Sequence, residues 1–558
     1  MINSKFKTSR QKQGSLASLP ASPSLGGRSG PPAAKLIIFV AIIVLALALR
    51  FYKLDTNPPG LNWDETVFGY DAYSISKTGR DHHNRFMPLF FESFGDWKLP
   101  VYHYLLVPSI KTLGLSEFSV RLPAALLGSI TVGIFFFLIK KITKNINLAL
   151  ASMLFLAISP WHIQFSRGGF ESTAGLFFTV SAVYLLLTGI SKKNTLFLVL
   201  ASLFFTLSIY SYHAYRIFTP LFVVALIILN TSFFKKNLRI LLLPGLLALL
   251  LTLPMIIFTL SPNGRARAIS QSAFSKGGVE IARFDFDQKS KKPLRFLSKY
   301  LFEPPVYYSQ IALKGYLDHF RPTFLFLQGD QTGRHSQVDM GQIYFFEAVL
   351  ILASLFALKR LKNPGHKIMI IWLLFAPIPA TIVTPTPHAY RTLQMTIPLA
   401  FFSALGAYYI FAKAKHYAAR AALVFVAIYF FASFTHLLFS HYPKKFAADW
   451  QDGNREMVKK VQQYQLNYEK VYITNINQVP YIFVLFYQKY DPAKFIAENG
   501  TKDAFNKYVF IDQETNIYNK GKILYVAPSW QKVDGTWLAA ADDSSGRHIY
   551  SLWEVGKD

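Results

Sequence analysis

The sequence predicts an α-helical polytopic membrane protein, with about eleven transmembrane helices and a small extracytoplasmic α/β domain at the C-terminus. Three observations predict this fold. Long hydrophobic runs recur along the chain, the loops between them alternate in charge, and short strand-like runs appear after the last hydrophobic run. Only 16% of the 558 residues are charged, well below the roughly 25% of a soluble domain.

The N-terminal residues 1–35 are rich in Ser, Pro, Gly and basic residues, and they contain almost no acid. This composition predicts a disordered basic tail on the cytoplasmic side. The hydrophobic run at 36–54 follows it without a small-residue cleavage site, and it begins later than the apolar core of a signal peptide. We therefore expect a retained membrane anchor.

The next hydrophobic runs approach or exceed the roughly 20 residues that a spanning helix needs. They lie near 118–139, 148–165, 171–190, 195–212, 214–231, 240–260, 343–358, 367–386, 392–412 and 418–440. The alternate loops at 140–144, 191–193, 233–239, 359–367 and 413–420 are basic and contain no acid. The positive-inside rule places these loops in the cytoplasm. The sequence thus predicts a transmembrane domain over 36–440.

The remaining loops then face outward, and three long segments lie on that side: 55–117, 261–342 and 441–558. Within the first, the apolar stretch 103–115 is short and contains a proline, which favours an interfacial or re-entrant helix. In the last segment a helix-like stretch at 452–465 precedes strand-like runs at 470–476, 507–512 and 522–528. This alternation predicts the small α/β domain. The apolar stretch 478–491 is interpreted first as part of its core.

The composition also limits the function. The chain has no cysteine, so disulfides, thiol chemistry and cysteine-ligated metals are excluded. Its net charge of +28 is explained by basic cytoplasmic loops and headgroup contacts, so we expect membrane lipids and no nucleic acid as partners.

Acidic residues gather directly after the first hydrophobic run, in the stretch NWDETVFGYDAY at 62–73. If this stretch is helical, Asp64 and Asp71 lie on nearly the same face, and Glu65 points about 100° away. Carboxylates beside a bilayer are poorly solvated, so they tend to be paired, to bind cations or to carry raised pKa values suited to proton transfer. Asp96 and Lys98 follow in the same external segment.

Basic residues on the external side are candidates for binding a phosphate, because guanidinium groups match phosphate oxygens well. The candidates are Arg167, Arg265, His388 and Arg391. The alternative for Arg167 is an interfacial anchor, and for Arg391 it is a snorkelling side chain.

A Gly-rich turn before the run at 343–358 contains Asp330, Arg334 and His335. A histidine beside an aspartate is a donor set for a divalent metal, but the usual spacing of three or four ligands is absent. A metal is therefore only weakly supported, and no metal ligand is assigned.

Several motifs resemble those of the GT-C membrane glycosyltransferases, and within them the bacterial branch of the protein O-mannosyltransferase family, glycosyltransferase family 39. They are PPGLNWDE, GYDAYSI, FFESFGDWKLPVYHYL, RLPAALLGS, SPWHIQFSR, GDQTGRHS and PHAYR, and they span about 55–440. In bacterial members an acidic residue followed by an aromatic one stands where this chain has His82 and His83. This puts a carboxylate role there in doubt.

The resemblance implies a helical bundle whose active site faces outward. It implies inverting transfer of a sugar, a hexose such as mannose, from a polyprenyl phosphate to an acceptor hydroxyl on a protein or glycolipid. Asp64 takes the place of the catalytic base, with Glu65 as its neighbour in the motif. Arg265, His388, Arg391 and Arg167 are expected to bind the lipid phosphate. Acceptor binding or loop support is expected of Asp71, Asp96, Lys98, Asp330, Arg334 and His335.

Other functions remain open at this stage. Aminoarabinose transfer to lipid A, or transfer to another glycolipid or wall polymer, would give the same hydropathy. A lipid-linked sugar transporter would place charges near mid-membrane and show paired broken helices in an internal repeat. A polysaccharide ligase or polymerase would concentrate its functional residues in a late external loop. The acidic motif in the first external segment favours a glycosyltransferase.

Overall fold

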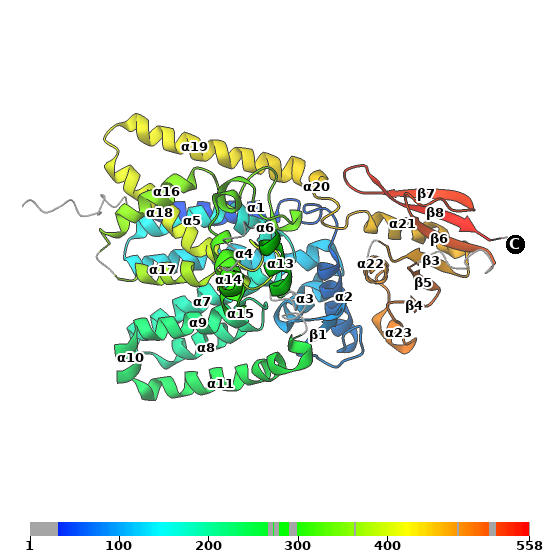
Figure 1. Cartoon of the computed structure of the whole chain (residues 1–558), viewed down its shortest axis with the longest axis horizontal. Coiled ribbons are helices and arrows are strands. Elements are labelled where there is room, and N and C mark those ends of the chain that lie inside the picture. Colours follow the sequence, from blue (N-terminus) through cyan, green and yellow to red (C-terminus); the bar gives the residue numbers. More distant parts are fainter. Residues whose placement is uncertain are drawn as a thin grey trace, which may run out of the picture.

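A computed structural model describes residues 32–265, 272, 278–289, 298–361, 364–476, 479–512 and 521–556. The predicted basic tail falls almost entirely outside the described residues, since the first helix begins at Pro32. The described chain forms a bundle of long helices with a mixed helix-and-sheet domain at one end (Figure 1).

Within the described residues, six helices are long and apolar enough to cross a membrane. They contain α1 (Pro32–Phe51), α4 (Glu117–Thr143), α7 (Glu171–Lys192), α11 (Leu238–Leu260), α18 (Thr396–Lys413) and α19 (Tyr417–His436). A seventh candidate is the pair α5 (Ile146–Ile158) and α6 (Pro160–Arg167), bent by 55°. Shorter apolar helices are α8 (Thr195–Ile209), α9 (Tyr215–Leu229), α16 (Glu347–Leu358) and α17 (His366–Phe375). Each predicted hydrophobic span overlaps one of these segments, which confirms the helical membrane fold class.

The bend between α5 and α6 has a local cause. Ser159 precedes Pro160 and adopts an extended conformation, as residues before proline prefer. Its hydroxyl then accepts a hydrogen bond from the His162 amide and caps α6. Arg50, at the end of α1, donates to the carbonyl of Ala157 at 3.2 Å and so satisfies the broken end of α5. The bend thereby brings α6 against α4 and α1.

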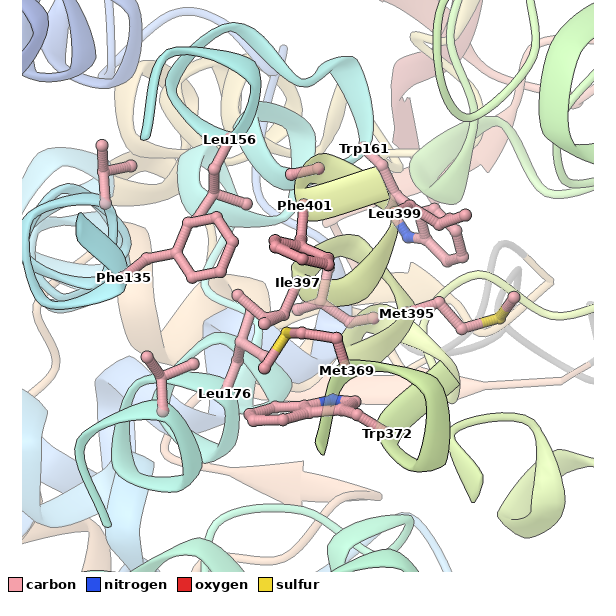
Figure 2. Packing of buried hydrophobic residues seen from close by; sticks show 14 of the residues in the cluster. Phe135, Leu156, Trp161, Leu176, Met369, Trp372, Met395, Ile397, Leu399 and Phe401 are labelled. Carbon is pink, nitrogen blue, oxygen red and sulfur yellow. The ribbon is translucent and has the colours of Figure 1, made fainter. Parts of the chain in front are cut away.

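Large apolar side chains from distant helices fill the bundle interior. Figure 2 shows Phe135 of α4 and Leu156 of α5 beside Phe401 of α18, with Trp372 of α17 below them. All four side chains are buried. Where α18 passes α16, Gly406 lets the helices approach so closely that an added Cβ would lie 1.7 Å from the Leu350 carbonyl oxygen.

The first external segment of the prediction, 55–117, forms a helix, a hairpin and a second helix. Helix α2 (Trp63–Thr78) comes first, the hairpin β1 (Phe91–Ser93) and β2 (Asp96–Lys98) follows, and α3 (Pro100–Leu113) leads back toward α4. The expected short helix at 103–115 therefore exists, and it begins three residues earlier. Its proline, Pro108, lies inside the helix.

The second segment predicted to face outward, 261–342, contains α13 (Gly278–Lys289), α14 (Ser298–Leu301) and α15 (Pro304–Asp318). From 319 to 346 the chain forms turns around two short helical segments, η2 (Thr323–Leu327) and η3 (Gly333–His335). The short α10 (Thr231–Lys236) joins α9 to α11.

The C-terminal domain contains a six-stranded mixed sheet of order β4-β5-β3-β6-β8-β7. The three predicted strand runs form β3 (Val471–Thr474), β5 (Tyr508–Ile511) and β6 (Ile523–Pro528), which pair in parallel. Three strands were not predicted: β4 (Ala504–Phe505), β7 (Thr536–Asp542) and β8 (His548–Val555). Among the described residues, three helices accompany the sheet: α21 (Asn454–Tyr464), α22 (Pro480–Tyr487) and α23 (Pro492–Ala497), while the short α20 (Tyr442–Lys445) follows α19 at the end of the bundle.

The sheet domain and the first external segment share one hydrophobic core. The stretch interpreted as core, 478–491, contains α22, whose residues from Pro480 to Phe486 are all buried. Both α22 and α23 pack against α2, and Phe486 lies against Gly69 of α2, where an added Cβ would meet its ring at 2.6 Å. The two regions therefore hold each other in place.

Gly406→Ala is expected to destabilise the protein by about 1–3 kcal/mol, because the added methyl group overpacks the contact between α16 and α18. Thermal unfolding in detergent measures the loss. Gly245→Ala in α11 is the matched control, since its added Cβ has no neighbour within 4 Å. Equal unfolding temperatures for the two variants would contradict this account of the contact.

Candidate functional site

The acidic motif begins the first helix outside the bundle. Asn62 caps α2, and its side-chain oxygen accepts hydrogen bonds from the amides of Asp64 and Glu65 at 2.9 and 3.2 Å. The Glu65 carboxylate in turn accepts a hydrogen bond from the Asn62 amide at 3.2 Å. This capping box, with two acids in the first turn, explains why the helix starts at this point.

Glu65 points into the protein. Its carboxylate accepts from Arg121 Nε at 3.1 Å and from the Gly169 amide at 2.7 Å, and the side chain is 1% exposed. The close approach requires a glycine at 169, because an added Cβ would lie 3.0 Å from Glu65 Cγ. Glu65 therefore does not line the cavity described below.

Two buried guanidinium groups hold the segment that leads from α1 into α2. Arg121 donates to the carbonyls of Leu54, Pro58 and Gly60 as well as to Glu65. Arg167, a candidate for binding phosphate, donates to the carbonyls of Leu49, Tyr52, Lys53 and Asn57. Both arginines are fully buried, so in this structure they bind backbone and lie away from the cavity.

Asp64 points the other way from Glu65 and is 32% exposed. Lys98 Nζ lies 2.9 Å from its carboxylate and 3.6 Å from that of Asp96. The lysine side chain is 8% exposed, so the hairpin of β1 and β2 holds its ammonium group firmly against α2. The structure thus brings together Asp64, Asp96 and Lys98, three candidates from the first external segment.

Asp64 lines a cavity of ≈ 160 Å³. Four other parts of the chain complete its wall, and the lining residues are Asn62, Asp64, Phe68, Gly169, Phe170, Tyr212, Arg334, His335, His388, Tyr390 and Arg391. Five candidates named from the sequence therefore meet at one place: Asp64, Arg334, His335, His388 and Arg391. The Arg334 guanidinium also lies 5.9 Å from the ring of Trp63, beside the acidic motif.

Aromatic side chains form much of the remaining wall. Tyr390 donates a hydrogen bond to Glu171, and its ring stacks on Tyr212 with centroids 4.3 Å apart. Phe170, Tyr212 and Tyr390 were not predicted as site residues from the sequence. In the sequence these residues are marked only as aromatics beside a motif, as in SYHAYR and PHAYR. Aromatic residues are common near membrane interfaces, so this pattern does not distinguish a site residue from an interfacial one.

Asp330 lies behind the cavity wall. Its carboxylate accepts from the Ala389 amide at 2.6 Å and from the Thr332 amide at 2.9 Å. Burial raises its pKa above the ordinary value. Burial, together with Arg334 and Arg391, holds the pKa of His335 well below its usual range. The neutral imidazole is therefore the stable form of His335 near neutral pH.

Two other candidates lie outside the cavity. Asp71 is buried on α2, where His82 Nδ1 lies 2.6 Å and His103 Nε2 lies 3.8 Å from its carboxylate. Although burial raises its pKa, the neighbouring His82 brings the pKa of Asp71 below the ordinary value. Arg265 follows α11 and is exposed. Asp71 therefore serves a buried contact in this structure, and Arg265 does not contribute to the cavity wall.

Comparison with known proteins supports the resemblance found in the sequence. The profile of the family described as dolichyl-phosphate-mannose-protein mannosyltransferase matches residues 98–258. Among solved structures, ArnT from Cupriavidus metallidurans bound to undecaprenyl phosphate has a TM-score of 0.54 at 13% identity, with 94% of this chain and 98% of that chain covered. Its apo structure gives 0.52 at 14% identity, covering 93% and 98%. A search of the curated proteins found no match.

Arg121→Met should lower the free energy of unfolding by about 3–5 kcal/mol, because it leaves the Glu65 carboxylate buried without its charge partner. Adding Glu65→Gln should recover part of this loss. Arg455→Met is the control, because its partner Glu117 lies at the same distance of 3.1 Å but the arginine is 30% exposed. Denaturation of the wild type, the two single variants at 121 and 65, the double variant and the control in detergent measures the coupling, and strictly additive losses for Arg121 and Glu65 would contradict it.

Proposed function

Because this chain is a membrane protein with the GT-C glycosyltransferase fold, we propose that it transfers a sugar from a polyprenyl phosphate to an acceptor hydroxyl at the extracytoplasmic face of the membrane. One observation carries the proposal: the cavity places a partly exposed carboxylate, Asp64, together with the basic side chains of Arg334, Arg391 and His388. Single displacement at a sugar phosphate requires both kinds of group in one small space.

Asp64 is proposed as the general base. It is the acid of its motif that reaches the cavity, whereas Glu65 is enclosed by Arg121 and Gly169. As the acceptor oxygen attacks the anomeric carbon, its proton passes to the Asp64 carboxylate. Lys98, at 2.9 Å, holds that carboxylate in one orientation toward the cavity. Glu65 then acts as a positioning residue that fixes the start of α2.

Arg391 and Arg334 are proposed to stabilise the leaving phosphate. Negative charge grows on its oxygens as the glycosidic C–O bond breaks, and guanidinium groups already in place lower the energy of that state. His388 lines the same part of the cavity. Arg167 and Arg265 receive no such role, since the first is occupied by backbone carbonyls and the second does not line the cavity.

A lipid-linked donor is supported by an apolar groove of ≈ 570 Å³ beside the site. Its lining includes Pro100 and Leu105 of α3, Leu207 of α8 and Leu251 of α11. Pro100 is only two residues from Lys98, so the groove begins next to the partner of the proposed base. We propose that the prenyl chain of the donor lies there while its phosphate reaches the cavity.

The sugar and the acceptor are proposed as a hexose, such as mannose, and a protein hydroxyl. The description of the matching family, which names a mannose donor and a protein acceptor, supports this choice. Transfer of aminoarabinose to a glycolipid is the second candidate, and the likeness to ArnT over nearly the whole chain favours it. Assays that supply each polyprenyl-phosphate sugar separately, with peptide or glycolipid acceptors, decide between them.

Asp64→Asn should reduce transfer by at least 100-fold, because the amide cannot accept the acceptor proton. The variant should fold, since Asn keeps the size of the side chain and the cap of α2 uses the backbone of residue 64. Transfer is measured with purified protein and a synthetic polyprenyl-phosphate sugar, and thermal unfolding serves as the folding control. Turnover like that of the wild type would exclude Asp64 as the base.

Arg391→Ala should lower kcat/KM for the lipid donor by about 10- to 1,000-fold, as expected for the loss of one charged donor to the leaving group. Arg391→Lys should restore only part of the activity, because an ammonium group lacks the fork of donors. Arg265→Ala is the matched control outside the cavity. Equal kinetics for the variants at 391 and 265 would remove Arg391 from the phosphate site.

A further inference from the structure

Three buried side chains at the back of the cavity bring metal-binding atoms close together. They are Asp330, His335 and His388, and one donor atom from each lies within 4.8 Å of the others. The Asp330 carboxylate lies 3.8 Å from His335 Nδ1 and 3.9 Å from His388 Nδ1. Across the described residues, no other group of three such side chains meets this criterion.

These distances are too long for direct hydrogen bonds, which need about 2.7–3.2 Å between nitrogen and oxygen. They are close to the separation of two ligands on one ion. A tetrahedral zinc ion holds nitrogen and oxygen ligands at about 2.0–2.2 Å, which puts the donors about 3.3–3.5 Å apart. A contraction of well under 1 Å would therefore bring the Asp330 carboxylate to the ligand distance from each histidine.

The surroundings fix the carboxylate and leave a nitrogen available. The Ala389 and Thr332 amides both donate to Asp330, which orients its carboxylate as supporting contacts do in metal sites. His335 Nδ1 is buried, and among the described residues no hydrogen-bond partner faces it. A buried imidazole nitrogen without a partner is costly, so a ligand for it is expected.

We propose that Asp330, His335 and His388 bind one divalent transition-metal ion, with zinc as the best match to two imidazoles and a carboxylate. This donor set is typical of zinc sites that keep a fourth position open. His335 and His388 both line the cavity, so the fourth position faces it and takes water or a phosphate oxygen.

The charged side chains around the site determine how tightly it binds the metal ion. Arg334 and Arg391 line the same cavity and repel a dication, while Asp64 and Asp330 attract it. A phosphate that contacts both the ion and the arginines offsets this repulsion. Metal and phosphate should therefore strengthen each other's binding by the same factor. On the proposed function, the ion would add to the positive charge with which Arg334 and Arg391 stabilise the leaving phosphate.

The test measures metal binding directly. Full-length protein without a histidine tag is prepared in a His436→Ala, His441→Ala background, because these exposed imidazoles lie 3.3 Å apart and would bind metal at the surface. After treatment with a chelator, the protein is titrated with Zn²⁺, and bound metal is counted by elemental analysis. Co²⁺ is added in parallel, since its visible absorption reports tetrahedral ligands. One ion per chain with a tetrahedral cobalt spectrum is the expected result.

His335→Ala and Asp330→Asn should each weaken Zn²⁺ binding at least 10-fold. His335→Gln replaces His335→Ala if the alanine variant fails to fold. The control is His548→Ala, which removes a partly exposed histidine of β8 outside the cavity and should leave affinity unchanged. Inorganic phosphate should raise the affinity of the unmodified site for zinc. Absence of bound metal, or equal affinity in the site and control variants, would overturn the proposal.

The outcome is separable from that of the proposed function. Zinc binding that depends on Asp330 and His335, without any sugar transfer, would uphold this inference and reject the transfer reaction. Full transfer by protein that binds no metal would reject this inference and uphold the transfer reaction.

Discussion

The buried ion pair between Glu65 and Arg121 is the contact on which the geometry of the external site depends. Arg121 binds Glu65 and, through three backbone carbonyls, the loop that joins α1 to α2. The Glu65 carboxylate also accepts a hydrogen bond from the Gly169 amide, so the pair connects α4 and the segment after α6 to the first turn of α2. Burying both charges costs desolvation, and the gain is one fixed orientation for the neighbouring Asp64.

Much of the membrane part was predictable because the bilayer imposes simple rules. A spanning helix needs a certain apolar length, and basic loops collect on one side. Each predicted hydrophobic range accordingly overlaps an apolar helix. The start of α2 was also predictable, since Asn62 and Glu65 have the spacing of a capping box. Asp64, Arg334, His335, His388 and Arg391 were all named from their motifs, and the cavity brings them together.

The pairing of buried polar side chains was not predictable from one sequence. Glu65 and Arg121 are 56 residues apart, and no periodic pattern connects them. The partners of Arg167 were likewise not predictable. Its sequence context fits a phosphate ligand, but in the folded protein it donates its hydrogen bonds to the end of α1 and the following loop. Strand β7 was missed because TWLAAAD carries three alanines and a terminal aspartate, which are poor strand formers.

The shared core of α2 with α22 and α23 has a consequence for how the protein matures. Helix α2 leaves the ribosome among the first elements, and its partners are more than 400 residues later in the chain. Until those partners are synthesised, the apolar face of α2 has no cover from them. A nascent chain halted before residue 480 would leave this face exposed. Assembly of the site is thus a late step, and quality control would have to recognise an unfinished product.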